Sequence, residues 1–386
     1  MNEFVYSYPT TVYFGQGAAA KHLPAALTHV GKTVMLAYGG GSIRKNGVYE
    51  EIKRILEEAG KTVVEFCGIM PNPTYAKVQE GAALAKEKGA EFILAVGGGS
   101  VIDCCKVISA QVKTEEDIWT LEHVEHRMPT AFLPMGAVVT ASGTGAEMNN
   151  IAVITHEAIK TKRSMKGASP DFAVLDPSYT LSLPMVQVFS GVFDTLSHCM
   201  ESYFGMPGCD NLTDQINEAI MRSVIRNARG LLTDPENLEI RGELEWASAM
   251  AENGMLKIGK VADFQAHQIE HQLGAYTDCN HGIGLAVIHP ALYRYLYQAA
   301  VPRFARFANV VWGIAPAGKT EEELALAGID ALADFIKEIG LPATLTEMGI
   351  ADDRILRAVA DTCILKEGCC KRLERDEIFA LLQECK

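Results

Sequence analysis

EFILAVGGGS, residues 91–100, joins a short apolar run to a cluster of glycines. The run has the length and composition of a buried strand, and VIDCCKVISA (101–110) has the pattern of a helix that follows at once. Glycines at such a junction expose backbone N–H groups at the positive end of a helix, where a phosphate can bind. The four junction residues, Gly97, Gly98, Gly99 and Ser100, therefore predict a phosphate-binding turn, with Ser100 as the N-cap of the helix. A plain tight turn is the alternative, because the segment is not the GxGxxG fingerprint.

The same strand-then-helix pattern recurs on both sides of this segment. A strand over KTVMLAYGGG (32–41) leads to a helix over NGVYEEIKRILEEAG (46–60), and a strand over KTVVEFCGI (61–69) leads to one over PNPTYAKVQEGAALAKEKGA (71–90). Further strand-like runs are TAFLPMG (130–136), IAVITHEA (151–158) and SPDFAVLDPSY (169–179). Alternating strands and helices predict a parallel α/β sheet.

The character of the chain changes near residue 182. Apolar residues then recur with a period of about 3.6 residues, which indicates helices. The clearest runs are MVQVFSGVFDTLSHCMESYF (185–204), TDQINEAIMRSVIRNARGLL (213–232) and ELEWASAMAENGMLKIGKVADFQAHQIEHQLGA (243–275). We expect an α/β dinucleotide-binding domain over residues 1–182 and an all-α domain over residues 183–386, since 386 residues suit two domains.

Composition excludes several classes of partner. The formal net charge of −13, without a clustered basic stripe, argues against nucleic acid. The chain has no run of about 20 apolar residues and no signal-like N-terminus, so we expect a cytoplasmic protein without a membrane partner. The ten cysteines form no CxxC pair, which favours reduced thiols. They are Cys67, Cys104, Cys105, Cys199, Cys209, Cys279, Cys363, Cys369, Cys370 and Cys385.

A second glycine turn ends the strand before residue 42. Its residues are Gly39, Gly40, Gly41 and Ser42, and the cations Arg44 and Lys45 follow. A carboxylate at this place would bind ribose hydroxyls and repel a 2′-phosphate, whereas glycines beside cations would accept the phosphate. The turn therefore favours NADP(H), with NAD(H) as the alternative. Arg44 and Lys45 are equally compatible with a solvated start of the next helix.

Ionisable side chains with helical spacing occur in the second half of the chain. Asp194 and His198 are four residues apart, as are His267 and His271, so each pair lies on one helix face. His281 follows after a short loop. A lone helical histidine is usually structural, and we interpret His22, His29, His123, His126, His156 and His289 in that way. The grouped residues instead predict a metal site.

Carboxylate and imidazole donors without thiolate suit Fe²⁺ or Zn²⁺, and the residues alone do not choose between the two metals. Such an ion acts as a Lewis acid on an alcohol or carbonyl oxygen and so favours hydride transfer. With Asp194, His198, His267 and His281 as ligands, His271 is a candidate proton relay beside the site.

Four ordered blocks resemble the iron-containing (group III) alcohol dehydrogenases, in particular their butanol-dehydrogenase-like branch. The blocks are GGGSVIDCCK (97–106), TASGTGAEMNNIAVIT (140–155), GVFDTLSHCMESY (191–203) and HQIEHQLGAYTDCNHGIGLAV (267–287). The resemblance implies a Rossmann-like N-terminal domain, a helical C-terminal domain, a metal and a nicotinamide that meet between them, and a homodimer paired through the N-terminal edge. It favours Fe²⁺ and places the family's metal ligands on Asp194, His198, His267 and His281.

The resemblance also implies cofactor contacts beyond the first turn. The nicotinamide-side positions are Thr140, Ser142, Gly143, Thr144 and Lys160, and Asp103 and Asn72 match motif positions with less specific roles. The chain departs from the family pattern at Cys104, Cys105, Asn150, Cys279 and Asn280, none of which is an expected ligand. We expect reversible reduction of small aldehydes such as butanal. A polyol or glycerol-type dehydrogenase and a non-catalytic nucleotide- or metal-binding relative are the alternatives.

Overall fold

The structure, a computed structural model, describes residues 2–206, 210–366 and 370–386. Cys209 and Cys369 lie outside these ranges, and the other eight cysteines are free thiols. The chain forms two compact units. One is Ser7–Leu183, and the other is Pro184–Lys386 together with the N-terminal residues through Tyr6.

The first unit is built on a parallel six-stranded sheet of order β1-β8-β5-β4-β2-β3. Its strands are β1 (Thr11–Phe14), β2 (Thr33–Tyr38), β3 (Thr62–Phe66), β4 (Phe92–Gly97), β5 (Met135–Val139) and β8 (Phe172–Leu175). Every neighbouring pair is parallel, and Ala37 of β2 lies opposite Ala95 of β4. The predicted parallel α/β sheet is confirmed.

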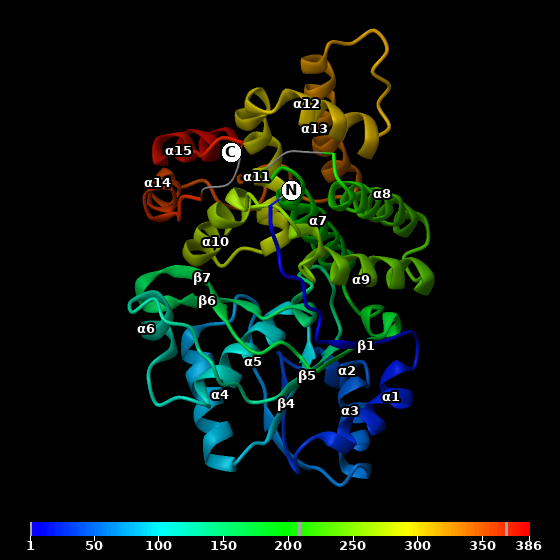
Figure 1. Cartoon of the computed structure of the whole chain (residues 1–386), viewed down its shortest axis with the longest axis vertical. Helices are drawn as coiled ribbons and strands as arrows, with labels where there is room; N and C mark the ends of the chain where they lie inside the picture. The colour runs from blue at the N-terminus through cyan, green and yellow to red at the C-terminus, as the bar shows by residue number, and fades with distance from the viewer. Residues whose placement is uncertain (1, 207–209, 367–369) are drawn as a thin grey trace. The chain divides into compact units, whose positions relative to one another are not determined.

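Helices cover both faces of this sheet. The helical segments of the unit are α1 (Ala18–Ala26), η1 (Leu27–His29), α2 (Ser42–Lys45), α3 (Val48–Glu58), α4 (Tyr75–Lys88), α5 (Gly99–Gln111), α6 (Ile118–His123), η2 (Ala146–Met148), η3 (Glu157–Ile159) and η4 (Pro177–Thr180). Leu36 and Leu94 belong to a core shared with α1 and α3, while the alternate residues Met35 and Ile93 are buried as well. Figure 1 shows α3 and α4 on opposite sides of β4. Burial on both faces explains the continuous apolar runs of the central strands.

One strand prediction in this unit is wrong in its bounds, and one predicted strand is confirmed but lies outside the parallel sheet. TAFLPMG was expected to be a strand, but β5 begins only at Met135, directly after Pro134. Proline has no N–H to donate to a central ladder, so the strand starts behind it. Residues Ile151–His156 (β6) pair antiparallel with Thr161–Lys166 (β7) in a separate two-stranded sheet. The polar sequence TKRSMK of β7 carries no strand signal.

The second unit is helical, as predicted. Its segments are α7 (Met185–Tyr203), α8 (Leu212–Thr233), α9 (Leu238–Glu252), η5 (Met255–Lys257), α10 (Gln265–Thr277), α11 (His281–Leu296), η6 (Tyr297–Ala299), α12 (Val301–Arg306), the π-helical η7 (Phe307–Val311), α13 (Glu321–Glu338), α14 (Asp353–Thr362) and α15 (Arg375–Glu384). Phe193 and Leu196 of α7 and Leu285 of α11 are fully buried in its core. No helix among the described residues is both long and apolar enough to span a bilayer.

The helical pattern over 243–275 is interrupted in the structure. α9 ends at Glu252, and α10 begins only at Gln265. Gly254 and Phe264 have positive φ values of 86° and 56°, which a continuous helix does not allow. The interruption ends immediately before the helix that carries His267 and His271.

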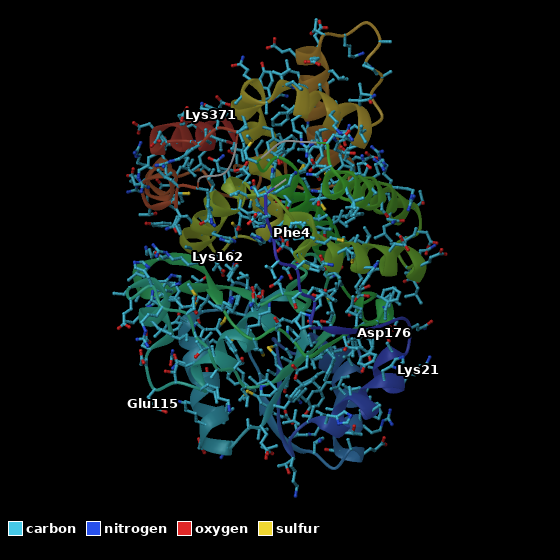
Figure 2. The ribbon with its side chains drawn as sticks, in the orientation of Figure 1. Phe4, Lys21, Glu115, Lys162, Asp176 and Lys371 are labelled. Carbon is cyan, nitrogen blue, oxygen red and sulfur yellow. The ribbon has the colours of Figure 1, made fainter. Side chains whose placement is uncertain are left out.

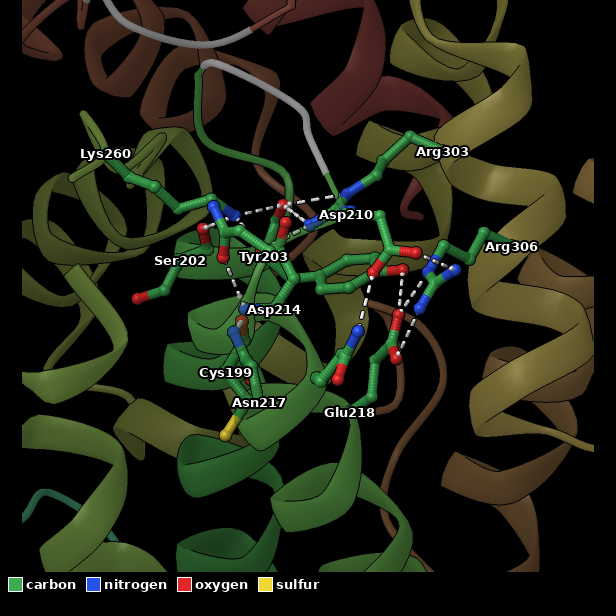
Figure 3. Close-up of polar contacts among 12 residues, drawn as sticks. Cys199, Ser202, Tyr203, Asp210, Asp214, Asn217, Glu218, Lys260, Arg303 and Arg306 are labelled. Carbon is green, nitrogen blue, oxygen red and sulfur yellow. Dashed lines mark hydrogen bonds and ion pairs between the residues drawn. The ribbon is translucent and has the colours of Figure 1, made fainter. Parts of the chain in front are cut away.

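A buried ion-pair cluster fixes the chain before α10 against the end of α7 (Figure 3). The carboxylate of Asp214, which is fully buried, pairs with Lys260 and, at 2.6 Å, with Arg303. Both cations also donate to the carbonyl oxygen of Tyr203, and the Arg303 guanidinium carbon lies 3.5 Å from the centroid of the Tyr203 ring. Four elements are thereby tied together: the end of α7, the start of α8, the segment that leads into α10, and α12.

Candidate metal centre and glycine-rich turns

The structure brings the four predicted metal ligands together within the helical unit. α7 carries Asp194 and His198, α10 carries His267, and His281 is the first residue of α11. Oδ1 of Asp194 lies 3.7 Å from Nε2 of His267 and 3.5 Å from Nε2 of His281. Ligand atoms of these three residues all lie within 4.8 Å of one another.

His198 lies next to two of these residues, His267 and Asp194. Its Nε2 lies 3.1 Å from Nε2 of His267, and its Nδ1 lies 3.7 Å from Oδ1 of Asp194. Donor atoms on one tetrahedral ion with bonds of about 2.0–2.1 Å are roughly 3.3 Å apart, so separations of this size suit a shared cation.

The polar atoms of the group fit a metal for a second reason. Asp194 and His198 are buried, yet Oδ1 of Asp194 and Nδ1 of His198 have no hydrogen-bond partner among the described residues. A buried polar atom without a partner costs free energy, and a bound cation would remove that cost at the carboxylate.

The pKa values of the grouped side chains are shifted in different directions. Burial lowers the pKa of His198, and burial would raise the pKa of Asp194, but the surrounding imidazoles hold that pKa well below its ordinary value. Burial also acts to lower the pKa of His267. The carboxylates of Glu201 and Asp194 outweigh this effect and raise the pKa of His267 to about 10. The group therefore attracts positive charge strongly.

Two carboxylates that the sequence analysis missed lie directly behind the histidines. Glu201 and Glu270 are fully buried, and they hydrogen-bond to Nδ1 of His267 and Nδ1 of His281, respectively. Glu201 follows His198 by three residues, and Glu270 follows His267 by three. This spacing was a signal that the two glutamates share a side of their helices with the histidines.

His271 lies beside the four predicted ligands. It is buried, and its ring centroid is 5.5 Å from that of His281 and 5.8 Å from that of His267. Its ligand atoms also lie within 4.8 Å of those of Glu270 and His281. The geometry thus places His271 where it could exchange a proton with a group near the site or contribute a ligand atom itself.

The first glycine turn in the sheet unit packs against a second loop. β4 ends at Gly97, and α5 begins at Gly99 with Gly98 as its N-cap, so Ser100 lies inside the helix and its predicted capping role is wrong. A β-carbon on Gly99 would lie only 2.3 Å from Oγ1 of Thr144. Thr140 donates its N–H to the carbonyl of Gly97. The structure thus brings Gly97–Ser100 beside the loop that holds Thr140, Ser142, Gly143 and Thr144.

Asp103 and Asn72 have internal partners in this unit. Oδ2 of Asp103 accepts the backbone N–H of Val153 at 2.9 Å. Oδ1 of Asn72, a residue with φ of 50°, accepts from the Lys162 ammonium at 2.9 Å. Lys162, labelled in Figure 2, is buried on β7, whereas Lys160 is exposed and has a positive φ. Lys162 is a third residue that sequence reasoning missed, because its partner Asn72 lies ninety positions away.

The second glycine turn leads into a mixed-charge cluster. Gly40 and Gly41 would accept a β-carbon with no atom within 4 Å, and Ser42 begins α2. The Arg44 guanidinium, expected to be available for a phosphate, binds the Tyr38 hydroxyl and, at 2.8 Å, the Glu65 carboxylate. Tyr38 and Glu65 therefore occupy part of the hydrogen-bonding capacity of Arg44.

Glu65 itself is shared by several groups. Besides Arg44, it accepts from the Tyr49 hydroxyl at 2.5 Å and from Lys53 at 3.0 Å. The hydrogen bond from Tyr49 is the main reason that the pKa of Glu65 falls to about 2, and Lys53 adds to the effect. One carboxylate thus faces two cations, so the group formed by Arg44, Lys53 and Glu65 carries a net positive charge.

Family models match both halves of the chain. The model described as iron-containing alcohol dehydrogenase matches residues 9–177, and the model for the C-terminal part of the Fe-containing alcohol dehydrogenase family matches residues 188–385. The probable NADH-dependent butanol dehydrogenase 1 of Bacillus subtilis is 38% identical over 99% of both chains. The NADPH-dependent aldehyde reductase YqhD of Escherichia coli is 35% identical, over 91% of this chain and 90% of its own.

Solved structures agree with these matches. The crystal structure of NADH-dependent butanol dehydrogenase A from Thermotoga maritima superposes with a TM-score of 0.93 at 34% identity, and it covers 100% of this chain and 99% of its own. The matched models span nearly the whole chain, and relatives above 30% identity cover it almost end to end. The chain belongs to the iron-containing alcohol dehydrogenase family.

Proposed function

We propose that the protein reduces small aldehydes such as butanal to primary alcohols, and oxidises the alcohols in reverse, with a nicotinamide dinucleotide as the hydride donor or acceptor. One observation carries the proposal. The buried side chains Asp194, His198 and His267 form a donor group with the partly exposed imidazole of His281, in a chain of the iron-containing alcohol dehydrogenase family. The names of the butanol dehydrogenases and the aldehyde reductase among its relatives support the substrate class.

Asp194, His198, His267 and His281 would hold the divalent cation, for which we propose Fe²⁺. Nitrogen and oxygen donors suit Fe²⁺ and also Zn²⁺, which is therefore the comparison metal. When bound, the cation supplies Lewis acidity toward the substrate oxygen. We assign to His271 the delivery of a proton from an imidazole nitrogen to the product oxygen, because it lies beside His281 without belonging to the four proposed ligands.

We assign dinucleotide binding to the unit Ser7–Leu183 and metal binding to the helical unit. The backbone at Gly97–Ser100 would receive the pyrophosphate at the start of α5, a helix of 13 residues. The proposed contacts around the rest of the cofactor are Asn72, Asp103, Thr140, Ser142, Gly143, Thr144 and Lys160.

We propose NADPH as the preferred cofactor over NADH. Gly39, Gly40 and Ser42 present no carboxylate to a 2′-phosphate, and β-carbons would meet open space at Gly40 and Gly41. The Glu65 carboxylate, which contacts Arg44 of α2, is paired with the cations Arg44 and Lys53. The relatives named above include both NADH- and NADPH-dependent enzymes. The preference for NADPH over NADH is therefore tested directly in the assay below.

We further propose a homodimer that pairs through the edge strand β1. Within the described residues β1 pairs with β8 alone, and Phe14 at its end is about half exposed. An unpaired parallel edge is a ready surface for strand addition. Light scattering after gel filtration should give twice the monomer mass of 41.9 kDa, and a monomeric mass would contradict this assignment.

The function is tested by butanal-dependent oxidation of NADPH and NADH with anaerobically purified protein. The assay is run as purified, after chelation, and after addition of Fe²⁺ or Zn²⁺. We expect chelation to abolish the activity and Fe²⁺ to restore it, with NADPH oxidised faster than NADH.

Other outcomes would change the proposal. Faster turnover with glycerol or dihydroxyacetone would identify a polyol dehydrogenase instead. NADPH binding without turnover on any carbonyl substrate would indicate a non-catalytic relative, and an NADH preference would overturn only the argument from Gly39 to Ser42.

A further inference from the structure

Two buried glutamates stand behind two of the proposed metal ligands. Glu201 on α7 binds Nδ1 of His267, and Glu270 on α10 binds Nδ1 of His281. Both carboxylates have no exposed surface. In each histidine the opposite nitrogen, Nε2, faces Asp194 at 3.7 or 3.5 Å. Each imidazole is therefore held by a carboxylate at Nδ1, and its Nε2 points into the proposed metal site.

We propose that Glu201 and Glu270 are positioning residues that keep Nδ1 of each histidine protonated and direct Nε2 toward the cation. The proposal rests on the proposed metal site. An imidazole whose Nδ1–H is held by a carboxylate has one tautomer and one ring orientation, and the negative charge makes Nε2 a stronger donor. Burying two carboxylates without such partners would cost free energy, so their placement calls for a function of this kind.

The two glutamates differ in what else they hold. The second carboxylate oxygen of Glu201 accepts the backbone N–H of Ala266 at 2.6 Å, at the start of the helix that carries His267. The second oxygen of Glu270 lies 3.8 Å from the Cys279 sulfur. Replacing Glu201 with glutamine would place an amide N–H against the N–H of Ala266 or against Nδ1–H of His267, whereas the amide of Glu270→Gln can face the Cys279 sulfur. Glu270 is therefore the better residue for a substitution that removes the charge and keeps a hydrogen-bond acceptor for His281.

A second cation held by Glu270, His271 and His281 is the competing interpretation, because ligand atoms of these residues lie within 4.8 Å of one another. We favour the positioning role because Glu270 and Nδ1 of His281 are in direct hydrogen-bond contact, with no room for an ion between these two atoms. The number of ions bound per chain distinguishes the two interpretations.

The test compares Glu270→Gln and Glu270→Ala with the unaltered protein, each stripped of metal. The Zn²⁺ dissociation constant and stoichiometry are measured by competition with a chromophoric chelator, and the His281 tautomer is read from long-range ¹H–¹⁵N imidazole spectra. We expect affinity to fall by about 10-fold in Glu270→Gln, which keeps an acceptor oxygen, and by about 100-fold in Glu270→Ala. Glu270→Ala should also lose the single Nδ1–H tautomer.

Glu218→Gln is the matched control. Glu218 is another buried glutamate of the helical unit, but its partners are Tyr203 and Arg306. This variant should bind Zn²⁺ within twofold of the unaltered protein even if it unfolds more easily. Circular dichroism on every variant verifies that it is folded.

Three results would overturn the positioning role. Unchanged affinity in Glu270→Ala would remove it, and equal weakening in Glu218→Gln would show a merely structural effect. Two ions per chain in the unaltered protein, with one lost in Glu270→Gln, would favour the second cation. Failure of the unaltered protein to bind Zn²⁺ or Fe²⁺ at all would instead refute the proposed metal site, so the two failures are distinguishable.

Discussion

Gly282 and Ser190 meet so closely that a β-carbon on Gly282 would lie 2.1 Å from the Ser190 carbonyl oxygen. The contact joins the first turn of α11 to α7, one residue beyond His281. Gly282→Ala should therefore push the helices apart, destabilise the helical unit by about 1–3 kcal/mol and reduce bound metal. Urea unfolding and metal analysis measure the two effects. Unaltered values for both would show that the helices can separate without cost.

His267 and His271 should respond differently to truncation. His267→Ala removes a proposed ligand, so metal content and activity should disappear together. His271→Ala should retain the metal but slow turnover by about 100-fold or more, as expected for loss of a proton-transfer group. Metal content by mass spectrometry and aldehyde-dependent NADPH oxidation provide the two readings. If both variants lose metal equally, the relay assignment for His271 is wrong.

Glu122 should make the sheet unit less stable as the pH rises. Burial raises the pKa of Glu122 to about 7, although its oxygens accept the backbone N–H of Lys166. The folded protein holds this proton more tightly than the unfolded chain, so stability falls as pH rises from about 4.5 to about 7. Glu122→Gln should remove the loss and gain about 2 kcal/mol more at pH 8 than at pH 5.

Urea titrations at the two pH values measure this difference. Glu87→Gln is the control, because Glu87 is largely exposed. A gain in Glu122→Gln that is equal at both pH values would mean that the carboxyl group does not titrate in this range.

Lys260→Met should test the buried ion cluster. It leaves the Asp214 carboxylate with Arg303 as its remaining charged partner in the cluster, and breaking a buried pair typically costs about 3–5 kcal/mol. Arg354→Ala removes an exposed pair with Asp352 and should cost less than about 1 kcal/mol. Urea unfolding of the two variants gives the comparison. Similar small losses in both would show that the cluster contributes little.

The sequence predicts most of the sheet unit because its central strands are apolar on both faces. Residues 91–100 define β4 and its glycine turn, and the structure follows that pattern closely. β5 begins later than predicted, because the prediction considered only apolar content and ignored that Pro134 has no N–H to donate to a neighbouring strand. β7 is missed because its polar sequence is stabilised by pairing with β6, which is a tertiary contact.

The candidate site was likewise predicted only in part. Helical spacing places Asp194 with His198 and His267 with His271, and the structure brings these pairs together with His281. Glu201 and Glu270 were missed although each follows a histidine by three residues, because helical spacing does not show that their carboxylates are buried against His267 and His281. The partner of Arg44 was also unpredictable, since Glu65 lies on β3, 21 positions beyond Arg44 of α2.

The spread of the donors along the chain has a consequence for chain entropy. Sixty-nine positions separate His198 from His267, and those two side chains lie on different helices. An ion that joins them closes a long loop, in the manner of a covalent cross-link, and so reduces the freedom of the unfolded chain. Loss of the ion should therefore lower the melting temperature of the helical unit, which carries all four donors.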